Sequence, residues 1–366
     1  MPPPRTPRRR SSSDRRRAAD PSDYEISAYE YRLPPGLIAQ QPLAERGASR
    51  LLVLERATGV LSHRVFSDLP ELLRPGDLLV VNRSRVFAAR LLGRREGGGA
   101  AEILLVRRCE PTVWSAMVRP GRRLRPGAVV DVAEGFRVRV EDAPAPGGLR
   151  AVRLLLDGLD PDAALERHGH VPLPPYIRRA DVREDRERYQ TVFARETGSV
   201  AAPTAGLHFT PELLDRLHAH GVGSTELVLH VGPGTFRPVE ADDVREHRVD
   251  PERFFIPEET AAAIDRARAE GRRVVAVGTT TTRALESAIG DSGRLHPGDG
   301  ETTLVVVPGF QFRVVDVLLT NFHLPRSSLL LLVSAFAGRE RVLAAYAEAV
   351  RRRYRFYSYG DAMLVV

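Results

Sequence analysis

Three histidines stand where strands are expected to end or helices to begin, among small residues that keep the backbone tight. His208 lies in "APTAGLHFT", His230 opens "HVGPGTF", and His323 lies in "TNFHLPRSS". An imidazole changes its charge near neutral pH, so these side chains are suited to accept or donate a proton during catalysis. One histidine in such a place is more often a satisfied core residue, but three in similar places favour a site.

A second candidate is an anion-binding helix start in "VAVGTTTTRALES" (275–287). A strand is expected to end at Gly278, after which Thr279 and Thr280 open a helix with Arg283 one turn in. Unpaired backbone N–H groups and the helix dipole favour a carboxylate or phosphate there. An ordinary capped helix explains the same residues equally well, so both interpretations stay open.

Two absences restrict the chemistry. Lysine is missing, since all 54 basic residues are arginine, so the chain offers neither a Schiff-base amine nor a P-loop lysine. An amine nucleophile would therefore come from a substrate. The single cysteine, Cys109, is typical of a reducing cytoplasm, and the ten histidines lack metal-ligand spacing, so no metal is expected.

The overall pattern predicts an α/β protein in which a larger layered α/β domain is interrupted by a small inserted β-barrel. From about residue 200, strands alternate with helices, which is typical of an α/β layer. From Val86 onward, short apolar runs are instead separated by Gly and Pro turns, which indicates an all-β unit. We expect the barrel over 86–165 and a discontinuous α/β catalytic domain over 23–85 and 166–366.

Caps and periodicity predict the individual elements. Thr210, Pro211 and Gly221 mark the start and end of one helix. Further helices are predicted over 258–270, 279–289 and 339–353, and strands over 225–231, 272–278, 302–307, 312–320 and 362–366.

This architecture would bring the candidate residues together. Strand ends and helix starts meet at one edge of an α/β sheet, where ligands usually bind. We therefore expect His208, His230, Arg283 and His323 to line a single pocket.

The net charge of +7 resides mostly in the N-terminal tail. Residues 1–20 contain seven Arg and two Asp, which account for five of the seven net charges. We expect a disordered, solvated arginine tail over 1–22, with contact to a polyanion as the alternative. No apolar run approaches the roughly 20 residues that span a bilayer, so no membrane contact is predicted.

Near the C-terminus, "RRRYRFYSYGDAM" (351–363) interleaves arginines with aromatic residues. Arg355 and Tyr357 are therefore candidates to pair with RNA phosphates and to stack on bases. A solvated helix end that runs into a core strand explains 351–353 equally well.

Long segments of the chain together resemble one known family. They include "LPPGLIAQQPLAERGASRLLVL", "GDLLVVNRSRVFAARL", "GHVPLPPYIRR", "VAAPTAGLHFT", "LHVGPGTFRPV", "VGTTTTRALES", "TNFHLPRSSLLLLVSAFAG" and "YRFYSYGDAMLVV". From about residue 24 to the C-terminus the sequence resembles the S-adenosylmethionine:tRNA ribosyltransferase-isomerases of queuosine biosynthesis. The resemblance implies an α/β domain interrupted by a small β-barrel, in agreement with the pattern above.

The resemblance also implies a reaction and its participants. The ribosyl group of S-adenosylmethionine, a co-substrate, moves onto the aminomethyl side chain of 7-aminomethyl-7-deazaguanosine at the tRNA wobble position. Adenine and methionine leave, and epoxyqueuosine is the product. The attacking amine then belongs to the RNA, which fits a chain without lysine. A cytoplasmic monomer that binds tRNA is expected.

Roles follow for particular residues as hypotheses. Proton transfer is assigned to the three histidines, and orienting or cation-facing roles to two carboxylates, Asp316 and Asp361. Arg283 with Thr279 and Thr280 is the expected carboxylate anchor. Further substrate-binding candidates are Asn321, Tyr176, Gln190, Asn82 and Arg85.

Two departures from the family pattern keep alternatives open. "NRSRV" (82–86) has Arg83 in place of a small polar residue, and "HRVDPE" (247–252) has Asp250 where a histidine is usual. A tRNA-binding protein that has lost catalysis, or an enzyme acting on another acceptor, are the alternatives to the transferase.

Overall fold

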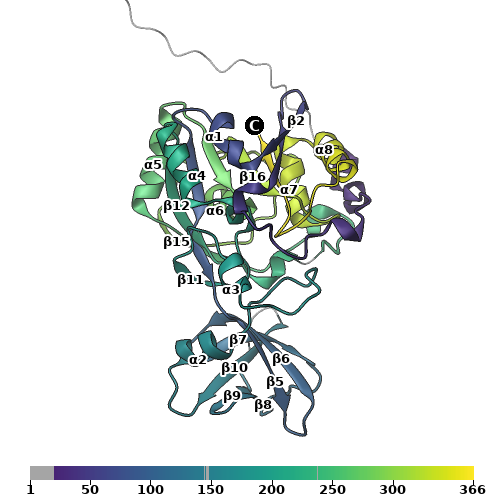
Figure 1. Cartoon of the computed structure of the whole chain (residues 1–366), viewed down its shortest axis with the longest axis vertical. Helices are drawn as coiled ribbons and strands as arrows, with labels where there is room; N and C mark the ends of the chain where they lie inside the picture. The colour runs from purple at the N-terminus through teal and green to yellow at the C-terminus, as the bar shows by residue number, and fades with distance from the viewer. Residues whose placement is uncertain (1–19, 144, 146–147, 237) are drawn as a thin grey trace, which may run out of the picture.

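The computed structural model describes residues 20–143, 145, 148–236 and 238–366, which form two bodies joined at a narrow waist (Figure 1). The larger body is an α/β domain, and the smaller one is a β-barrel. Most of the predicted tail over 1–22 lies outside the described residues. The described part of this tail, 20–22, contains the start of the 3-10 helix Pro21–Tyr24, and Asp20 is the N-cap of that helix.

A nine-stranded mixed sheet forms the centre of the α/β domain, in the order β15-β13-β12-β3-β14-β16-β17-β1-β2. Strands β3, β12, β14 and β16 are mutually parallel, β17 runs antiparallel to β16, and β1 runs parallel to β17. The strand bounds are β1 Arg50–Leu54, β2 Leu61–Val65, β3 Leu78–Asn82, β12 Gly223–Leu229, β13 Glu252–Ile256, β14 Val274–Val277, β15 Gly298–Thr302, β16 Val317–Asn321 and β17 Ala362–Val365.

Helices cover both faces of this sheet. One face packs against α5 (Glu258–Ala269), α6 (Thr279–Ala288), α7 (Ser328–Ala337) and α8 (Arg339–Arg351), and the other against α1 (Leu69–Leu72) and α4 (Pro211–Ala219). Leu78 and Val80 of β3 face the first layer, whereas Leu79 and Val81 face the second. Because both faces are buried, the central strands are continuous apolar runs, and each such side chain contributes about 1.5–3 kcal/mol.

Six antiparallel strands close the barrel in the order β10-β7-β6-β5-β8-β9. Alternate residues point inward and fill its core, as in the buried Phe136, Val138 and Val140 of β9. Helix α2 (Pro161–His168) packs Ala164 and Leu165 against this core. The strand bounds are β5 Arg90–Arg95, β6 Ala100–Arg108, β7 Val113–Arg119, β8 Val129–Ala133, β9 Phe136–Val140 and β10 Arg150–Leu156.

The waist holds the segments that enter and leave the barrel. Strand β4 (Ser84–Val86) leads into the barrel and pairs with β11 (Glu196–Ser199), which follows the return and the short helix α3 (Asp185–Arg188). The returning chain is tied back where His170 and Arg90 exchange backbone hydrogen bonds. The barrel is thus an insertion between β3 and β12 of the large sheet.

The predicted fold class is confirmed, and so are the helices that were predicted from caps. Thr210 accepts a hydrogen bond from the Leu213 amide and caps α4, as expected. The strand predicted over 302–307 is wrong, since β15 ends at Thr302. Helix α7 lies in a segment whose leucine run, buried on nearly every side, carries no periodic polar face. The domain boundaries at 86 and 165 stay a prediction.

Candidate active site

The carboxyl ends of four parallel strands meet at the edge of the large sheet that faces the barrel (Figure 1). Strands β3, β12, β14 and β16 end there at Asn82, Leu229, Val277 and Asn321. Strand β17 is antiparallel to β16, so its first residue, Ala362, lies beside Asn321. This edge is where an open α/β sheet usually binds ligands.

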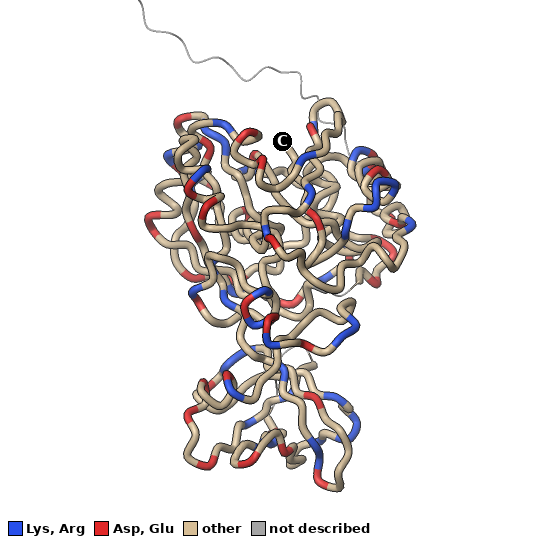
Figure 2. The backbone as a smooth tube through the Cα atoms, viewed as in Figure 1, with Lys and Arg blue, Asp and Glu red and all other residues tan. Residues whose placement is uncertain are grey.

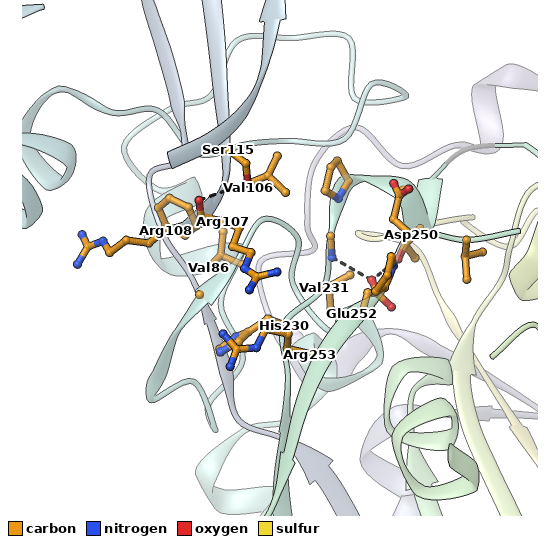
Figure 3. A pocket seen from close by; sticks show the side chains of 18 of the residues that line it. Val86, Val106, Arg107, Arg108, Ser115, His230, Val231, Asp250, Glu252 and Arg253 are labelled. Carbon is orange, nitrogen blue, oxygen red and sulfur yellow. Dashed lines mark hydrogen bonds between the residues drawn. The ribbon is translucent and has the colours of Figure 1, made fainter. Parts of the chain in front are cut away.

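A pocket of about 990 Å³ opens between this edge and the barrel (Figure 3). The α/β domain and the barrel both line it, the former with His230 and Arg283 and the latter with Arg107 and Trp114. Two smaller hollows, of about 40 and 20 Å³, continue along the sheet edge. The first shares Val231 and Thr235 with the large pocket, and the second shares Ser358 with the first.

His230, directly after β12, is partly buried at the wall of the large pocket. Its Nδ1 lies 2.8 Å from the Ser84 hydroxyl, which in turn lies 2.6 Å from the Ser199 hydroxyl. The ring packs on Gly198, where any Cβ would come within 2.6 Å of the imidazole. Burial and then the positive charge of Arg253 lower the pKa of His230. The imidazole is therefore oriented through Nδ1 and stays neutral at pH 7, with Nε2 unbonded by the described residues.

His323 follows β16 and lines the first of the small hollows. Its Nε2 lies 2.9 Å from the Thr320 hydroxyl, its backbone N–H donates to the Tyr346 hydroxyl at 3.1 Å, and its carbonyl accepts a hydrogen bond from Tyr31. Burial lowers its pKa to about 3. A neutral imidazole in this position is a hydrogen-bonding group and not a cation.

His208 ends the 3-10 helix Thr204–His208 and lines the second small hollow. Its Nδ1 lies 2.9 Å from the Ser49 hydroxyl, and its Nε2 lies 3.2 Å from the Asn321 amide nitrogen. The ring stacks on Phe66 with centroids 4.8 Å apart. Burial lowers its pKa to about 3, so both nitrogens serve as neutral partners within the fold.

The expectation of one shared pocket is wrong in detail. Of the four residues, His230 and Arg283 line the large pocket, His323 lines the first small hollow and His208 lines the second. All four lie along one sheet edge, because His230, Arg283 and His323 follow strands that end there, and His208 contacts Asn321 at the end of β16.

Arg283 forms a buried ion pair with Glu252, whose side chain is 6% exposed. The other carboxylate oxygen of Glu252 accepts hydrogen bonds from the Gly232 amide at 2.9 Å and the Thr235 hydroxyl at 2.8 Å. Arg283 also donates Nε–H to the Leu304 carbonyl. Its remaining nitrogen, Nη2, is buried without a partner among the described residues, which fits a group that meets an anion.

The start of α6 has the features expected of an anion site. Gly278 has φ 94° and ψ 155°, a conformation available in practice only to glycine, and no side chain caps the helix. Thr279 and Thr280 line the first small hollow, and the Thr280 hydroxyl there lacks a described partner. The same holds for the Oδ1 atom of Asn321. Buried polar atoms are normally satisfied, so these atoms are available to hydrogen-bond a polar ligand in the hollow.

Two predicted residues from other segments join this hollow. The Tyr176 hydroxyl hydrogen-bonds to Ser358, and its ring meets the Tyr357 ring edge-on with centroids 3.9 Å apart. Tyr357 is 7% exposed, and its carbonyl accepts a hydrogen bond from Asn321. Tyr357 thus lies inside the site and not on an outer surface, where its predicted RNA contact would require it.

Three further predicted substrate contacts have different surroundings. The Asn82 side chain bonds the backbone of Leu229 and of Ser84, which fixes the ends of β3 and β12 to one another. Gln190 clamps the backbone N–H and carbonyl of Val86 at 3.0 and 2.6 Å, at the joint to the barrel. Arg85 is exposed and lines the large pocket.

The two predicted carboxylates lie away from the pockets. Asp316 precedes β16, at the opposite edge of the sheet, where it accepts a hydrogen bond from the Val274 amide. Asp361 is 1% exposed and receives a 2.9 Å ion pair from Arg50 and a hydrogen bond from the Arg355 amide. Each carboxylate is therefore satisfied by the protein. Arg355 itself donates to the Gln41 carbonyl.

Sequence reasoning missed several residues of the large pocket, notably Glu252, Arg107 and Arg253. Figure 3 places Arg107, His230 and Arg253 on one side of the pocket and Asp250 and Glu252 on the other. Glu252 could have been found, because it stands with Asp250 in the segment where the chain departs from its family. Nothing local signals Arg107, which reaches the pocket only through the docking of the barrel.

The second departure, Arg83, lies outside the pockets. Its guanidinium is 3.5 Å from Glu196 and 3.7 Å from Glu226, so two carboxylates offset its charge.

Within the described residues, no three His, Cys, Asp or Glu side chains are placed to hold a metal ion. No helix among these residues is long and apolar enough to cross a membrane.

Comparison with known proteins gives consistent matches over nearly the whole chain. The model of the queuosine biosynthesis protein family matches residues 26–365. The S-adenosylmethionine:tRNA ribosyltransferase-isomerase of Heliobacterium modesticaldum is 52% identical over 93% of this chain and 100% of its own length. That of Anaeromyxobacter dehalogenans is 54% identical, covering 93% of this chain and 99% of its own.

Among solved structures, the S-adenosylmethionine tRNA ribosyltransferase of Thermotoga maritima matches with a TM-score of 0.53 and 39% identity, over 93% of this chain and 100% of that one. Both bodies and the sheet edge between them fall within these matches. From the family match, the near-complete relatives and the shared fold, it follows that this chain belongs to the queuosine biosynthesis protein family.

Proposed function

We propose that this chain is an S-adenosylmethionine:tRNA ribosyltransferase-isomerase. It transfers and isomerises the ribosyl moiety of S-adenosylmethionine onto the aminomethyl group of 7-aminomethyl-7-deazaguanosine at the tRNA wobble position. The products are epoxyqueuosine, adenine and methionine. The observation that carries the proposal is identity above 50% to enzymes of this name, over 93% of the chain and essentially all of theirs.

The sheet edge provides an anchor for the methionine part of S-adenosylmethionine. Its carboxylate would meet the free N–H groups at the start of α6 together with the unpartnered Thr280 hydroxyl and Arg283 nitrogen. Arg283 and Thr280 line adjoining pockets and lie one turn apart on α6, so one ligand end can contact both. Asn321 and Tyr176 would contact the same ligand in the first small hollow.

His230 is the proton-transfer residue that the geometry favours. It is the one of the three candidate histidines that lines the large pocket, and its Nε2 is not bonded by the described residues. Ser84 fixes Nδ1, so the ring presents Nε2 in a defined tautomer. The neutral imidazole is placed to remove the proton that the adjacent sulfonium acidifies, or to move a proton as adenine leaves. His208 and His323 would support the site as neutral hydrogen-bonding groups.

A second candidate function is favoured by one observation. Asp250, which replaces the usual histidine, lines the large pocket, so the departure falls within the site. A family member that binds tRNA without catalysis, or that uses another acceptor, would follow if this position were needed for the chemistry.

One incubation distinguishes these functions. The protein is mixed with S-adenosylmethionine and tRNA carrying the aminomethyl base, and adenine and the modified nucleoside are measured by chromatography and mass spectrometry. Adenine release with epoxyqueuosine is the expected result. Binding of the tRNA without release of adenine would favour the non-catalytic function. The absence of both tRNA binding and adenine release would favour another acceptor. The same tRNA lacking the aminomethyl group is the control.

The setting of this reaction is part of the proposal. A tRNA substrate and a single exposed cysteine suit the cytoplasm. We expect the protein to act as a monomer without a metal ion, with S-adenosylmethionine consumed as co-substrate. Gel filtration with light scattering and an assay in the presence of a chelator check both expectations.

A further inference from the structure

The arginines on one side of the large pocket have little acidic compensation. Arg85 and Arg253 are exposed and form no ion pair among the described residues. Arg107, on the barrel, reaches only Glu301 of β15, at 4.0 Å, and both side chains remain more than half exposed. Three cationic groups with little or no acidic compensation therefore line the same pocket as His230.

These three arginines come from both bodies. Arg107 is the penultimate residue of the barrel strand β6, Arg85 lies in β4 at the joint, and Arg253 lies in β13 of the α/β sheet. In Figure 3, Arg107 descends from the barrel toward the same side of the pocket as His230 and Arg253. Figure 2 shows basic positions on both bodies beside the waist. A ligand bound here would touch the barrel and the α/β domain at once.

The type of ligand follows from the charge and its location. Separate guanidinium groups at a solvent-open rim suit an extended anion with several charges, and RNA phosphates meet this requirement. The carboxylate of S-adenosylmethionine carries one charge and is served inside the site by Arg283. Trp114, the indole on the barrel wall, is held between Phe87 and Arg108, so its ring is not free to stack on a base. Backbone recognition therefore dominates at this rim.

We propose that Arg85, Arg107 and Arg253 form a phosphate-binding rim that grips the RNA backbone on both sides of the reacting nucleotide and directs its base toward His230. The inference rests on the proposed function, because the RNA substrate comes from it. The barrel then serves as one half of an RNA clamp, and its Arg107 is a binding residue for the same reaction.

The test uses full-length protein and labelled tRNA carrying the aminomethyl base, with affinity measured by fluorescence anisotropy across a salt series. The double variant Arg107→Ala/Arg253→Ala should bind the tRNA at least roughly 10-fold more weakly. The slope of log affinity against log salt should fall by about 0.7 for each lost contact. Affinity for S-adenosylmethionine alone, measured by calorimetry, should stay at the wild-type value.

Two further variants sharpen the result. Arg216→Ala removes an exposed arginine from α4, on the far side of the α/β domain, and should leave the affinity and the salt slope unchanged. Glu301→Gln removes the weak partner of Arg107 without touching the rim, so tRNA should bind more tightly. Weaker binding in the double variant together with tighter binding in Glu301→Gln would not arise from unfolding.

Failure of this inference is separable from failure of the proposed function. Wild-type affinity and salt slope in the double variant, with adenine still released by the wild type, would overturn the rim alone. A wild-type protein that binds the tRNA through these arginines but releases no adenine would overturn the proposed function and leave the rim in place.

Discussion

At the scale of single residues, the environment of each histidine determines what it can do. His208 and His323 are buried and neutral, whereas His230 faces the large pocket with one nitrogen fixed and the other free of described partners. Two of the three candidates thus lie in the fold as neutral hydrogen-bonding groups, and the third is the one that we propose for proton transfer.

The first prediction concerns the charge next to His230. Arg253 lowers the pKa of His230, beyond the larger effect of burial, while Glu196 acts in the opposite direction and the neighbouring Ser84 is neutral. Replacing Arg253 by Ala should therefore raise this pKa toward the usual value near 6.5. Since a general base must be neutral, the acid limb of the pH profile for adenine release should move to higher pH.

The profile is measured at saturating tRNA, so that weaker RNA binding does not contribute. A His230→Ala variant should lose about 10²- to 10⁴-fold in rate and no longer show this limb. An unchanged limb in Arg253→Ala would mean that His230 is not the group that titrates.

The second prediction concerns folding stability in acid. The pKa of His208 and of His323 is about 3 in the folded protein and near 6.5 when unfolded, so the unfolded chain binds more protons between these values. Folding stability should therefore fall as the pH drops below about 6.5. The loss by pH 5 should be about 2 kcal/mol for each histidine.

Urea unfolding at pH 7 and pH 5 measures this loss. Substituting His208 by Gln removes one of the two titrating groups, so the difference between the two pH values should shrink by about 2 kcal/mol. The same pH dependence in variant and wild type would contradict the assignment.

The residues whose place at the sheet edge could be predicted are those fixed by their position along the chain, although their roles stay a prediction. His230, Gly278 and His323 follow strands and Asn321 ends one, and strand ends can be located from apolar runs. Asp361 could not be separated from these residues by sequence, because its engagement by Arg50 depends on the pairing of β17 with β1.

At the scale of elements, the sharpest local constraint is the turn from β14 into α6. The backbone at Gly278 adopts a conformation that side chains resist, and it directs the first N–H groups of α6 to the small hollow. This turn is where local geometry and the proposed carboxylate site coincide.

The third prediction separates strain from ligand binding at this turn. Gly278→Ala should cost about 1–3 kcal/mol of stability through strain at positive φ. It should also weaken binding of S-adenosylmethionine, because the N–H groups shift. Gly293→Ala is the matched control, since Gly293 also has positive φ, with open space around it, but lies outside the pockets.

Denaturant unfolding and calorimetry report the two effects. Loss of stability is expected in both variants, and loss of S-adenosylmethionine affinity only in Gly278→Ala. Equal ligand affinity in the two variants would remove the start of α6 from the proposed binding site.

Local sequence signals decided which elements could be predicted. Helix α4 has a capping Thr, an initial Pro and a terminal Gly, so its bounds were clear in advance. Helix α7 is buried nearly all round and has no polar face, so its hydrophobic pattern does not indicate a helix. The β-branched run after Thr302 resembles a strand in sequence. In the structure the strand β15 ends at Thr302, and the run that follows is not part of the sheet.

At the scale of the whole molecule, the large pocket exists only because the barrel docks against the α/β sheet edge. The insertion of the barrel was visible in the sequence, since the spacing of turns changes at its borders. Its orientation was not, because it depends on contacts between residues far apart in the chain, such as Gln190 with Val86 and Arg107 with Glu301.

The fourth prediction concerns the joint between the two bodies. Gln190→Ala leaves the N–H and carbonyl of Val86 without their partner, which should cost about 1–3 kcal/mol. The barrel should then move more freely, so hydrogen exchange around residues 86–90 should accelerate and KM for tRNA should rise more than kcat falls.

Gln311→Ala provides the comparison, because Gln311 is exposed and its side chain bonds only the nearby Gly309 carbonyl among the described residues. Exchange rates and KM should stay at wild-type values there. If Gln190→Ala also leaves the exchange rates and KM at wild-type values, the joint does not control the pocket.

The pairing of β1 with β17 determines when the large sheet can fold during synthesis on the ribosome. Barrel strands pair mostly with close neighbours in sequence, so the barrel can form while synthesis continues. Strand β1, made early, must wait for β17, some 300 residues later, and the edge that holds Asn321 is bordered by that same last strand. A nascent chain therefore lacks the strand between β1 and β16 until Ala362–Val365 have been made, and a translation product cut short before Ala362 should carry a folded barrel but no working site.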